Sequence, residues 1–194
     1  YSDWCLSVLA EDLGCKEAAA EYFERSRSYS KVFDEEQGWF RPRNADGTWK
    51  EWPEEGRLKE SYGCVESNLY QQGWFVPHDI PGMADLMGGR TKTLADLTNF
   101  FEKCPSDFLW NAYYNHANEP VHHVPFLFNR LGAPWLTQYW TRAICNGAYK
   151  NKVEGLVGNE DVGQMSAWYV LSAMGFHPVC PGETRYELTT PLFD

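Results

Sequence analysis

The chain has 194 residues, the size of one ordinary domain or of a piece of a larger protein. Its 17 Lys and Arg residues stand against 27 Asp and Glu residues, so the formal net charge is −10. Because this charge repels phosphate backbones and anionic lipids, we expect no nucleic-acid partner and no membrane-surface role. The sequence holds no apolar run long enough to span a membrane, and its first residues show no signal-peptide pattern.

Aromatic residues make up 16% of the chain, with 9 Trp, 11 Tyr and 11 Phe, although the mean hydropathy is −0.52. Many rings must therefore lie beside polar groups. A Trp-rich helical core explains this composition, and so do flat apolar faces that pack against sugar rings. The 6 cysteines show no C-x-x-C spacing, which argues against a zinc or thioredoxin-like site. We expect mostly free thiols, with one disulfide left open.

Apolar residues recur every three or four positions over most of the chain, which indicates amphipathic helices. We expect a first helix that ends near Gly14 and a second of about five turns that starts at Lys16. Further helices are predicted near residues 61–75, 80–87, 91–103, 121–150 (broken at 132–134) and 164–174. The one convincing strand covers 186–190. The body of the chain is therefore predicted to be all-α.

Residues 34–59 lack this periodicity and carry Gly, Pro and an Asp-Gly pair. Unstructured connections of this length inside a compact domain are usually functional. Either a binding site or an aromatic-stapled surface loop is therefore expected from Trp39, Arg41, Arg43, Trp49 and Trp52.

Tyr62, Glu66, Tyr70 and Trp74 are four residues apart, which would align them along one side of the helix predicted at 61–75. A carboxyl among aromatic rings is costly to ionise, so the pKa of Glu66 is expected to rise, as a general acid requires. A structural ion pair with Lys or Arg is the alternative.

Asn118 and Glu119 precede Pro120, so their oxygens would lie at the start of a helix. The adjacent His122 and His123 point about 100° apart around a helix axis and do not easily bind one metal together. Hard oxygen donors such as Glu119 and Asn118 suit calcium instead.

Two further acidic residues lie at predicted helix starts. Asp79 comes just before Ile80 and fits a helix cap. Asp161 lies in a glycine-flanked turn that leads into the helix at 164–174. Free backbone N–H groups there would stabilise its anion and lower its pKa, as a general base requires, although a plain helix cap rests on the same physics.

Glu66 is thus expected to hold its proton and Asp161 to lose it. Opposed pKa values of two carboxylates are typical of glycoside hydrolysis. The separation of the two groups, which the sequence leaves open, would decide between direct attack by Asp161 and attack by a water that it activates.

Three stretches together resemble glycoside hydrolase family 92, a family of exo-α-mannosidases: ESNLYQQGWFVPHD (66–79), NEPVHH (118–123) and GNEDVGQMSAWYVLSAMGFHPVCPG (158–182). Support comes from GWFRPRNADGTW (38–49) and GAPWLTQ (132–138). The resemblance runs in register over nearly the whole chain.

The resemblance implies an (α/α)6 toroid, of which residues 1–182 would form the second half. Residues 183–194 would begin a C-terminal β region. The first half of the toroid and an N-terminal β-sandwich would belong to the remainder of the same polypeptide. Because an incomplete toroid leaves apolar faces uncovered, we expect the isolated segment to be poorly stable and inactive.

Members of this family hydrolyse α-linked mannose with inversion and require Ca²⁺. The resemblance therefore implies that Glu66 is the general acid and that Asp161 is the base that activates water, with Asn159 beside it. Some relatives carry Asp at the position of Asn159, and Asn cannot act as a base. The implied calcium ligands are Glu119 and Asn118. Substrate binding is implied for Asn68, Trp74, His78, Asp79, Asn118 and Gln164.

The implied substrate is a terminal α-linked mannose of a glycan, with α-1,2 or α-1,3 linkages favoured. The implied location is that of an exported bacterial protein: periplasmic, cell-surface or secreted. Two alternatives stay open. One is another (α/α)-toroid glycosidase or lyase, and the other is a non-catalytic carbohydrate-binding descendant.

Overall fold

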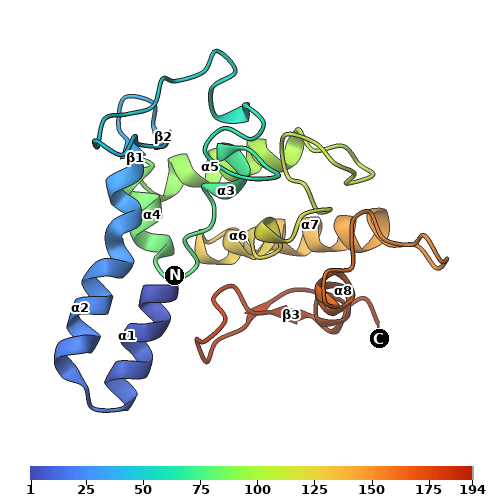
Figure 1. Cartoon of the computed structure of the whole chain (residues 1–194). Coiled ribbons are helices and arrows are strands. Elements are labelled where there is room, and N and C mark those ends of the chain that lie inside the picture. Colours follow the sequence, from blue (N-terminus) through green and yellow to red (C-terminus); the bar gives the residue numbers. More distant parts are fainter. Residues whose placement is uncertain (194) are drawn as a thin grey trace.

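The computed structural model describes residues 1–193 and is predominantly helical (Figure 1). Helices α1 (Ser2–Asp12) and α2 (Lys16–Ser26) form an antiparallel hairpin that projects from the rest of the molecule. The predicted turn at Gly14 is confirmed, since this residue has a positive φ of 75°. The predicted five-turn second helix is wrong in its last part, because α2 ends at Ser26 and a 3₁₀ helix, η1, follows it (Arg27–Val32). Within the described residues, no helix is both long enough and apolar enough to cross a bilayer.

The stretch predicted to lack periodic structure contains a small hairpin. Strand β1 (Phe33–Asp34) pairs antiparallel with β2 (Trp39–Phe40), with Phe33 opposite Phe40. A short 3₁₀ helix, η2 (Gly56–Leu58), closes the stretch. The Arg43 guanidinium lies 3.5 Å from the centre of the Trp49 ring, and Arg41 pairs with Asp34 at 2.8 Å. These contacts favour the interpretation of an aromatic-stapled loop.

The helix predicted at 61–75 is wrong over most of its length. Only α3 (Leu69–Gln72) is helical, and residues 61–67 form turns and bends. Asn68 starts α3 with a capping box: its side chain accepts a hydrogen bond from the Gln71 N–H at 3.0 Å, and the Gln71 side chain accepts one from the N–H of Asn68 at 3.3 Å. Tyr62 and Glu66 therefore do not share a helix face with Tyr70.

The helices predicted at 80–87 and 91–103 are confirmed as α4 (Ile80–Leu86) and α5 (Arg90–Glu102). The break predicted at 132–134 is confirmed as well, since α7 begins after it (Pro134–Gly147). The stretch before α7 is more fragmented than predicted. It consists of two 3₁₀ helices, η3 (Glu119–Val121) and η4 (Val124–Phe126), and of α6 (Leu127–Arg130).

Helix α8 (Gln164–Met174) follows the predicted bounds and ends at Gly175, whose φ of 96° is the left-handed conformation of a C-terminal cap. Strand β3 (Phe176–His177) then pairs antiparallel with β4 (Glu187–Leu188). The predicted strand at 186–190 is confirmed in its centre. Arg130 on α6 forms ion pairs with Glu187 and with Glu183, which ties this hairpin to the helical body. The division of the chain at residues 182 and 183 stays a prediction.

The core is aromatic, as the composition predicts. Trp39, Trp74 and Trp168 are 0–1% exposed. The Trp39 and Trp74 rings pack edge to face at 5.2 Å between centroids, and Tyr70 packs on Phe100 at 4.7 Å. This core lies between α3, α5 and the segment 114–128, and so it supports the loops that carry the polar motifs.

Candidate active site

Three motifs that are far apart in the sequence meet in space. The Asn118 side-chain amide donates to the carbonyl oxygen of Glu66 at 2.9 Å, which joins the loop 61–67 to the start of η3. A Cβ atom on Gly158 would lie only 2.4 Å from the carbonyl oxygen of Ala117, so this position tolerates no side chain. The turn that carries Asn159 and Asp161 therefore packs directly against the segment that carries Asn118.

The carboxyl groups of these motifs converge on Glu119. Burial raises the pKa of Glu119, and contact with the carboxyl of Asp161 and the negative charge of Glu66 raise it further. One oxygen of Glu119, Oε1, is buried and has no hydrogen-bond partner. Glu119 is thus the half-buried member of an acidic cluster that Glu66, Glu119 and Asp161 form.

Glu66 and Asp161 both have backbone conformations in the left-handed region. Their φ angles are 54° and 40°, and both residues are exposed. Non-glycine residues seldom adopt this conformation, and in proteins it is concentrated at functional sites. The expected enclosure of Glu66 among aromatic rings of one helix is wrong, because Glu66 lies on a bend outside α3.

Asp161 does not cap α8. The helix begins at Gln164, its N-cap residue is Gly163, and no side chain caps it there. Glu160 instead accepts hydrogen bonds from the backbone N–H of Ser166 at 2.9 Å and from its hydroxyl at 2.7 Å. These bonds lower the pKa of Glu160. Glu160, and not Asp161, is therefore the acidic residue that caps the start of α8. The carboxyl of Asp161 faces Glu119 instead.

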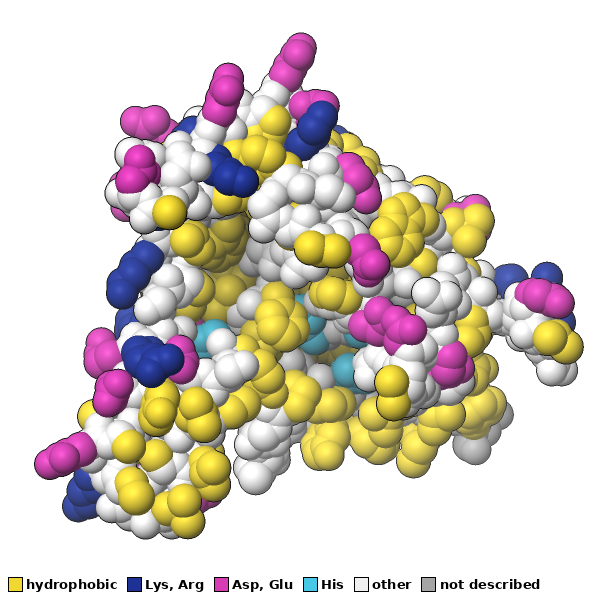
Figure 2. Space-filling model, in the orientation of Figure 1, with side chains coloured by type: hydrophobic (Ala, Val, Ile, Leu, Met, Phe, Trp, Pro, Cys, Tyr) yellow, Lys and Arg dark blue, Asp and Glu magenta, His cyan; other side chains and the backbone are white. Residues whose placement is uncertain are grey.

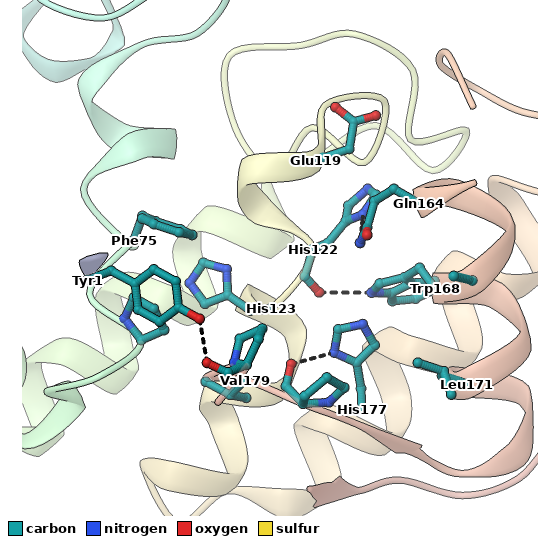
Figure 3. Close-up of a pocket in the computed structure, with 14 residues that line it drawn as sticks. Tyr1, Phe75, Glu119, His122, His123, Gln164, Trp168, Leu171, His177 and Val179 are labelled. Atoms are coloured by element: carbon teal, nitrogen blue, oxygen red, sulfur yellow. Dashed lines mark hydrogen bonds between the residues drawn. The ribbon is translucent and has the colours of Figure 1, made fainter. Parts of the chain in front are cut away.

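A cavity of about 220 Å³ lies beside this acidic cluster (Figure 3). One side of the cavity is lined by Glu119, His122 and Gln164. The adjacent side is lined by Trp168 and Leu171 of α8. Tyr1, Phe75 and the segment around Val179 close the opposite side. In the space-filling view, His side chains lie in the hollow of this face, with acidic side chains beside them (Figure 2).

His122 holds Gln164 in a defined orientation. The Nε2 atom of His122 lies 3.0 Å from the carbonyl oxygen of His116, so it must carry a proton and donate. Burial lowers the pKa of His122 to about 4, so the ring is neutral and Nδ1 is an acceptor. The side-chain NH₂ of Gln164 lies 3.3 Å from this Nδ1 and donates to it. The carbonyl oxygen of Gln164 is then left to accept a hydrogen bond from a ligand.

A second buried histidine supports the first. Tyr149 donates its hydroxyl proton to the carbonyl oxygen of Met165 at 3.0 Å, so it must accept from Nε2 of His116 at 2.7 Å. Nδ1 of His116 then accepts from the hydroxyl of Tyr114 at 2.7 Å. Burial lowers the pKa of His116 well below its usual value. This neutral network ties the start of α8 to the segment before η3.

Three other residues expected to bind substrate cap helices or lie buried in the core. Asn68 caps α3 and donates to the carbonyl oxygen of Ala112 at 2.9 Å. Asp79 caps α4 through the Gly82 N–H at 3.0 Å, as the sequence predicts. Trp74 is 0% exposed, and its indole N–H is buried without a partner. The substrate-binding roles of Asn68, Asp79 and Trp74 stay predictions.

His78 lies apart from the acidic cluster, beside Tyr1 and Trp4 of the N-terminal helix. Its Nε2 donates to the carbonyl oxygen of Ser26 at 3.0 Å, and burial lowers its pKa. Its substrate-binding role also stays a prediction.

Two contributors to the site leave no signal in the sequence. The contact of His122 with Gln164 joins residues 42 positions apart, which no local pattern reveals. Tyr1 lines the cavity from the other end of the chain. Neither contact leaves a periodic or motif-like signal.

The family model described as the glycosyl hydrolase family 92 catalytic domain matches residues 1–194. The chain is similar to the family GH92 α-mannosidase BT3965 from Bacteroides thetaiotaomicron, with 33% identity and a TM-score of 0.88 over 97% of this chain and 25% of that one. It is also similar to the GH92 inverting mannosidase BT2199 from the same organism, with 32% identity and a TM-score of 0.87 over 100% of this chain and 28% of that one.

Among curated proteins, an uncharacterized secreted glycosidase from Arthroderma benhamiae is 28% identical over 100% of this chain and 26% of its own length. The chain thus spans about a quarter of the relatives it matches. The predicted fold class is confirmed, since these helices correspond to part of an (α/α) toroid. The chain belongs to glycosyl hydrolase family 92, as a part of its catalytic domain.

Proposed function

We propose that the full protein is an exo-acting α-mannosidase that hydrolyses terminal α-linked mannose from glycans with inversion of the anomeric configuration. The observation that carries this proposal is the convergence of Glu66, Glu119 and Asp161 from three separate motifs beside one cavity. Two similar solved structures are described as mannosidases, one of them as inverting. Another describes BT3965 in complex with mannoimidazole, at 30% identity and a TM-score of 0.85 over 97% of this chain and 27% of that one.

In this proposal Glu66 is the general acid and Asp161 the general base. Glu66 protonates the leaving glycosidic oxygen while Asp161 takes a proton from the attacking water. Both side chains are exposed, so substrate and water can reach them, and both act electrostatically on Glu119, which lines the cavity. An inverting pair needs a separation of roughly 6.5–9.5 Å to leave room for the water. Asn159, two residues before Asp161, contributes a hydrogen-bonding amide and no base.

Gln164 and Asn118 are proposed to orient the sugar. The amide of Gln164 is held by His122, which leaves its carbonyl oxygen for a sugar hydroxyl. Asn118 donates its amide to Glu66 and so positions the loop of the general acid. Phe75, which is 45% exposed, lines the cavity, and its apolar ring suits the C–H face of a sugar.

We also propose that calcium binds at Glu119 and Asn118. Oε1 of Glu119 is a buried carboxylate oxygen without a partner, and the negative charges of Asp161 and Glu66 near this group favour a cation. Within residues 1–193 no group of three or more His, Cys, Asp and Glu side chains is arranged to hold a metal. Water, backbone carbonyls and sugar hydroxyls would therefore complete the ligand shell. When bound, calcium would favour the flattened sugar ring of the oxocarbenium-like transition state.

The preferred linkages are proposed to be α-1,2 or α-1,3, and the protein is proposed to be exported from a bacterium. A secreted location is part of the name of the curated fungal relative, which supports export.

The test is mannose release from an α-mannobiose by the full polypeptide, with and without a calcium chelator, with the anomer first formed read by NMR. The proposal expects β-mannose that disappears on chelation and returns with added calcium. α-Mannose as first product would contradict inversion, and release indifferent to chelation would contradict the calcium site. Cleavage of other polysaccharides instead would favour another toroid enzyme. Sugar binding without cleavage, unchanged by Glu66→Gln, would favour a carbohydrate-binding descendant.

A further inference from the structure

One face of α1 packs against the segment that follows β3. Tyr1, Trp4 and Cys5 occupy positions i, i+3 and i+4, so their side chains lie on the same side of the helix start. The hydroxyl of Tyr1 donates to the carbonyl oxygen of Pro181, drawn as a dashed line in Figure 3. A Cβ on Gly182 would lie 3.5 Å from the Trp4 ring. Residues 181 and 182 therefore contact the face of α1 that also presents Cys5.

Cys180 directly precedes these contacts, so its thiol is brought to the same face. It is 0% exposed, whereas Cys5 is half-buried. Burial raises the pKa of the Cys180 thiol to about 12, and the charges of Glu183 and Cys5 add to this effect. Burial also raises the pKa of the Tyr1 hydroxyl, and its contact with Cys5 and the charge of Cys180 raise it further, so this hydroxyl lies near both cysteine side chains. Both are free thiols in this structure.

We propose that Cys5 and Cys180 form a disulfide when the protein folds in an oxidising compartment. This depends on the export proposed above, since such bonds persist outside the reducing cytosol. The link would join the N-terminal helical hairpin to the segment after β3. Because Tyr1, Val179 and Pro181 line the cavity beside the acidic cluster, the bond would also hold one wall of the candidate active site.

The oxidant is a disulfide donor, such as a periplasmic dithiol oxidase or glutathione disulfide. The thiolate of Cys5, the more accessible of the two, attacks a donor sulfur, and one donor thiolate leaves. Cys180 then loses its proton and attacks the Cys5 sulfur of this mixed disulfide, which releases the second donor thiolate. Two protein thiols are oxidised, one donor disulfide is reduced, and the two protons pass to the donor thiols.

The other four cysteines have no comparable pairing. Cys64 and Cys104 donate to carbonyl oxygens, of Ser67 at 3.3 Å and of Tyr114 at 3.0 Å. Cys145 is buried on α7, and Cys15 is exposed at the turn of the α1–α2 hairpin. Cys15 is the matched control, because it lies in the turn between α1 and α2, and Figure 1 shows this turn at the end of the hairpin that is away from the rest of the molecule.

The experiment is peptide mapping by mass spectrometry of the full polypeptide, produced once with export to a bacterial periplasm and once in the cytosol. Each sample is denatured and alkylated without reductant. In the exported protein we expect the Cys5 and Cys180 peptides to be joined and to separate on reduction. In the cytosolic protein both should be alkylated. Joined peptides should persist in exported Cys15→Ser, whereas exported Cys180→Ser should have an alkylated Cys5.

The proposal is overturned if both cysteines of the exported wild type are alkylated, or if Cys5 is joined to another cysteine. The wild-type map decides this even if Cys180→Ser does not fold. The readout needs no enzymatic activity, so it also stands apart from the outcome of the mannose-release test.

Discussion

The side-chain amide of Gln164 donates to Nδ1 of His122 over 3.3 Å, and this bond joins the first turn of α8 to the segment that follows Glu119. His122 is itself anchored through Nε2 to the carbonyl oxygen of His116 at 3.0 Å. The His122 ring that holds Gln164 is therefore buried and neutral, since burial lowers the pKa of His122 to about 4.

His122→Ala should weaken substrate binding and turnover because it releases Gln164. A misplaced contact of this kind costs about tenfold to a hundredfold in kcat/KM. His122→Asn keeps one donor and one acceptor and should recover part of the loss. The measurement is kcat and KM for a mannobiose with the full polypeptide, together with Tm values. Equal kinetics for the Ala and Asn variants at equal Tm would contradict a positioning role.

Glu66→Gln should abolish cleavage of substrates with poor leaving groups and partly spare activated aryl mannosides, because these need less help from an acid. General acid catalysis contributes about 10²-fold to 10⁴-fold. Asp161→Asn should disable both substrate types, since each needs an activated water. The control is Glu60→Gln, which removes an exposed carboxyl from the neighbouring loop. Equal losses on both substrates for Glu66→Gln would count against the acid role, and Asp161→Asn activity within about tenfold of wild type would move the base elsewhere.

Acid should destabilise the protein before its carboxylates titrate. Burial lowers the pKa of His122, His123 and His177 to about 4. Histidines of an unfolded chain have a pKa near 6.5. Below about pH 6.5 the unfolded state therefore binds more protons than the folded state, whose buried histidines stay neutral. The free energy of unfolding should therefore fall as the pH decreases from about 6.5 to about 4, by up to about 3 kcal/mol for each histidine.

The check is urea unfolding of the full polypeptide at a series of pH values. His177→Phe is the informative variant, because the His177 ring stacks on Phe126 with 4.8 Å between centroids and an aromatic ring can replace it there. This variant should lose stability less steeply between pH 6.5 and 5. A wild-type stability that stays flat over this interval would contradict the argument.

The 194-residue chain on its own should be poorly stable and inactive. Large apolar side chains are exposed on its helices: Leu13 next to α1 is 70% exposed, Phe23 on α2 is 47%, and Trp135 and Tyr139 on α7 are 62% each. We expect the rest of the polypeptide to cover such faces. Calorimetry should show no cooperative melt for the isolated chain and a cooperative one for the full polypeptide. A cooperative melt with full mannose release by the isolated chain would refute this.

The sequence by itself determined the helices whose signals are local. The periodicity of 91–103 and 164–174 and the stop at Gly175 depend on residues three or four positions apart, and the structure agrees closely. The same spacing predicted a helix at 61–75 that does not form over most of its length, because Ser61 and Glu66 have left-handed backbone conformations. The true start was also encoded locally, in the capping box of Asn68 and Gln71.

Tertiary structure alone decided the chemical surroundings of the motifs. The sequence indicated Glu66, Glu119 and Asp161 as acidic candidates, but their convergence depends on the contacts of Asn118 with Glu66 and of Gly158 with Ala117. The contact of Gln164 with His122 and the contacts of Tyr1 with Pro181 and of Trp4 with Gly182 likewise join distant segments. Such contacts arise only when the aromatic core closes the chain on itself. Local sequence preferences determine where the helices form, and burial of the aromatic core determines which helix ends come together.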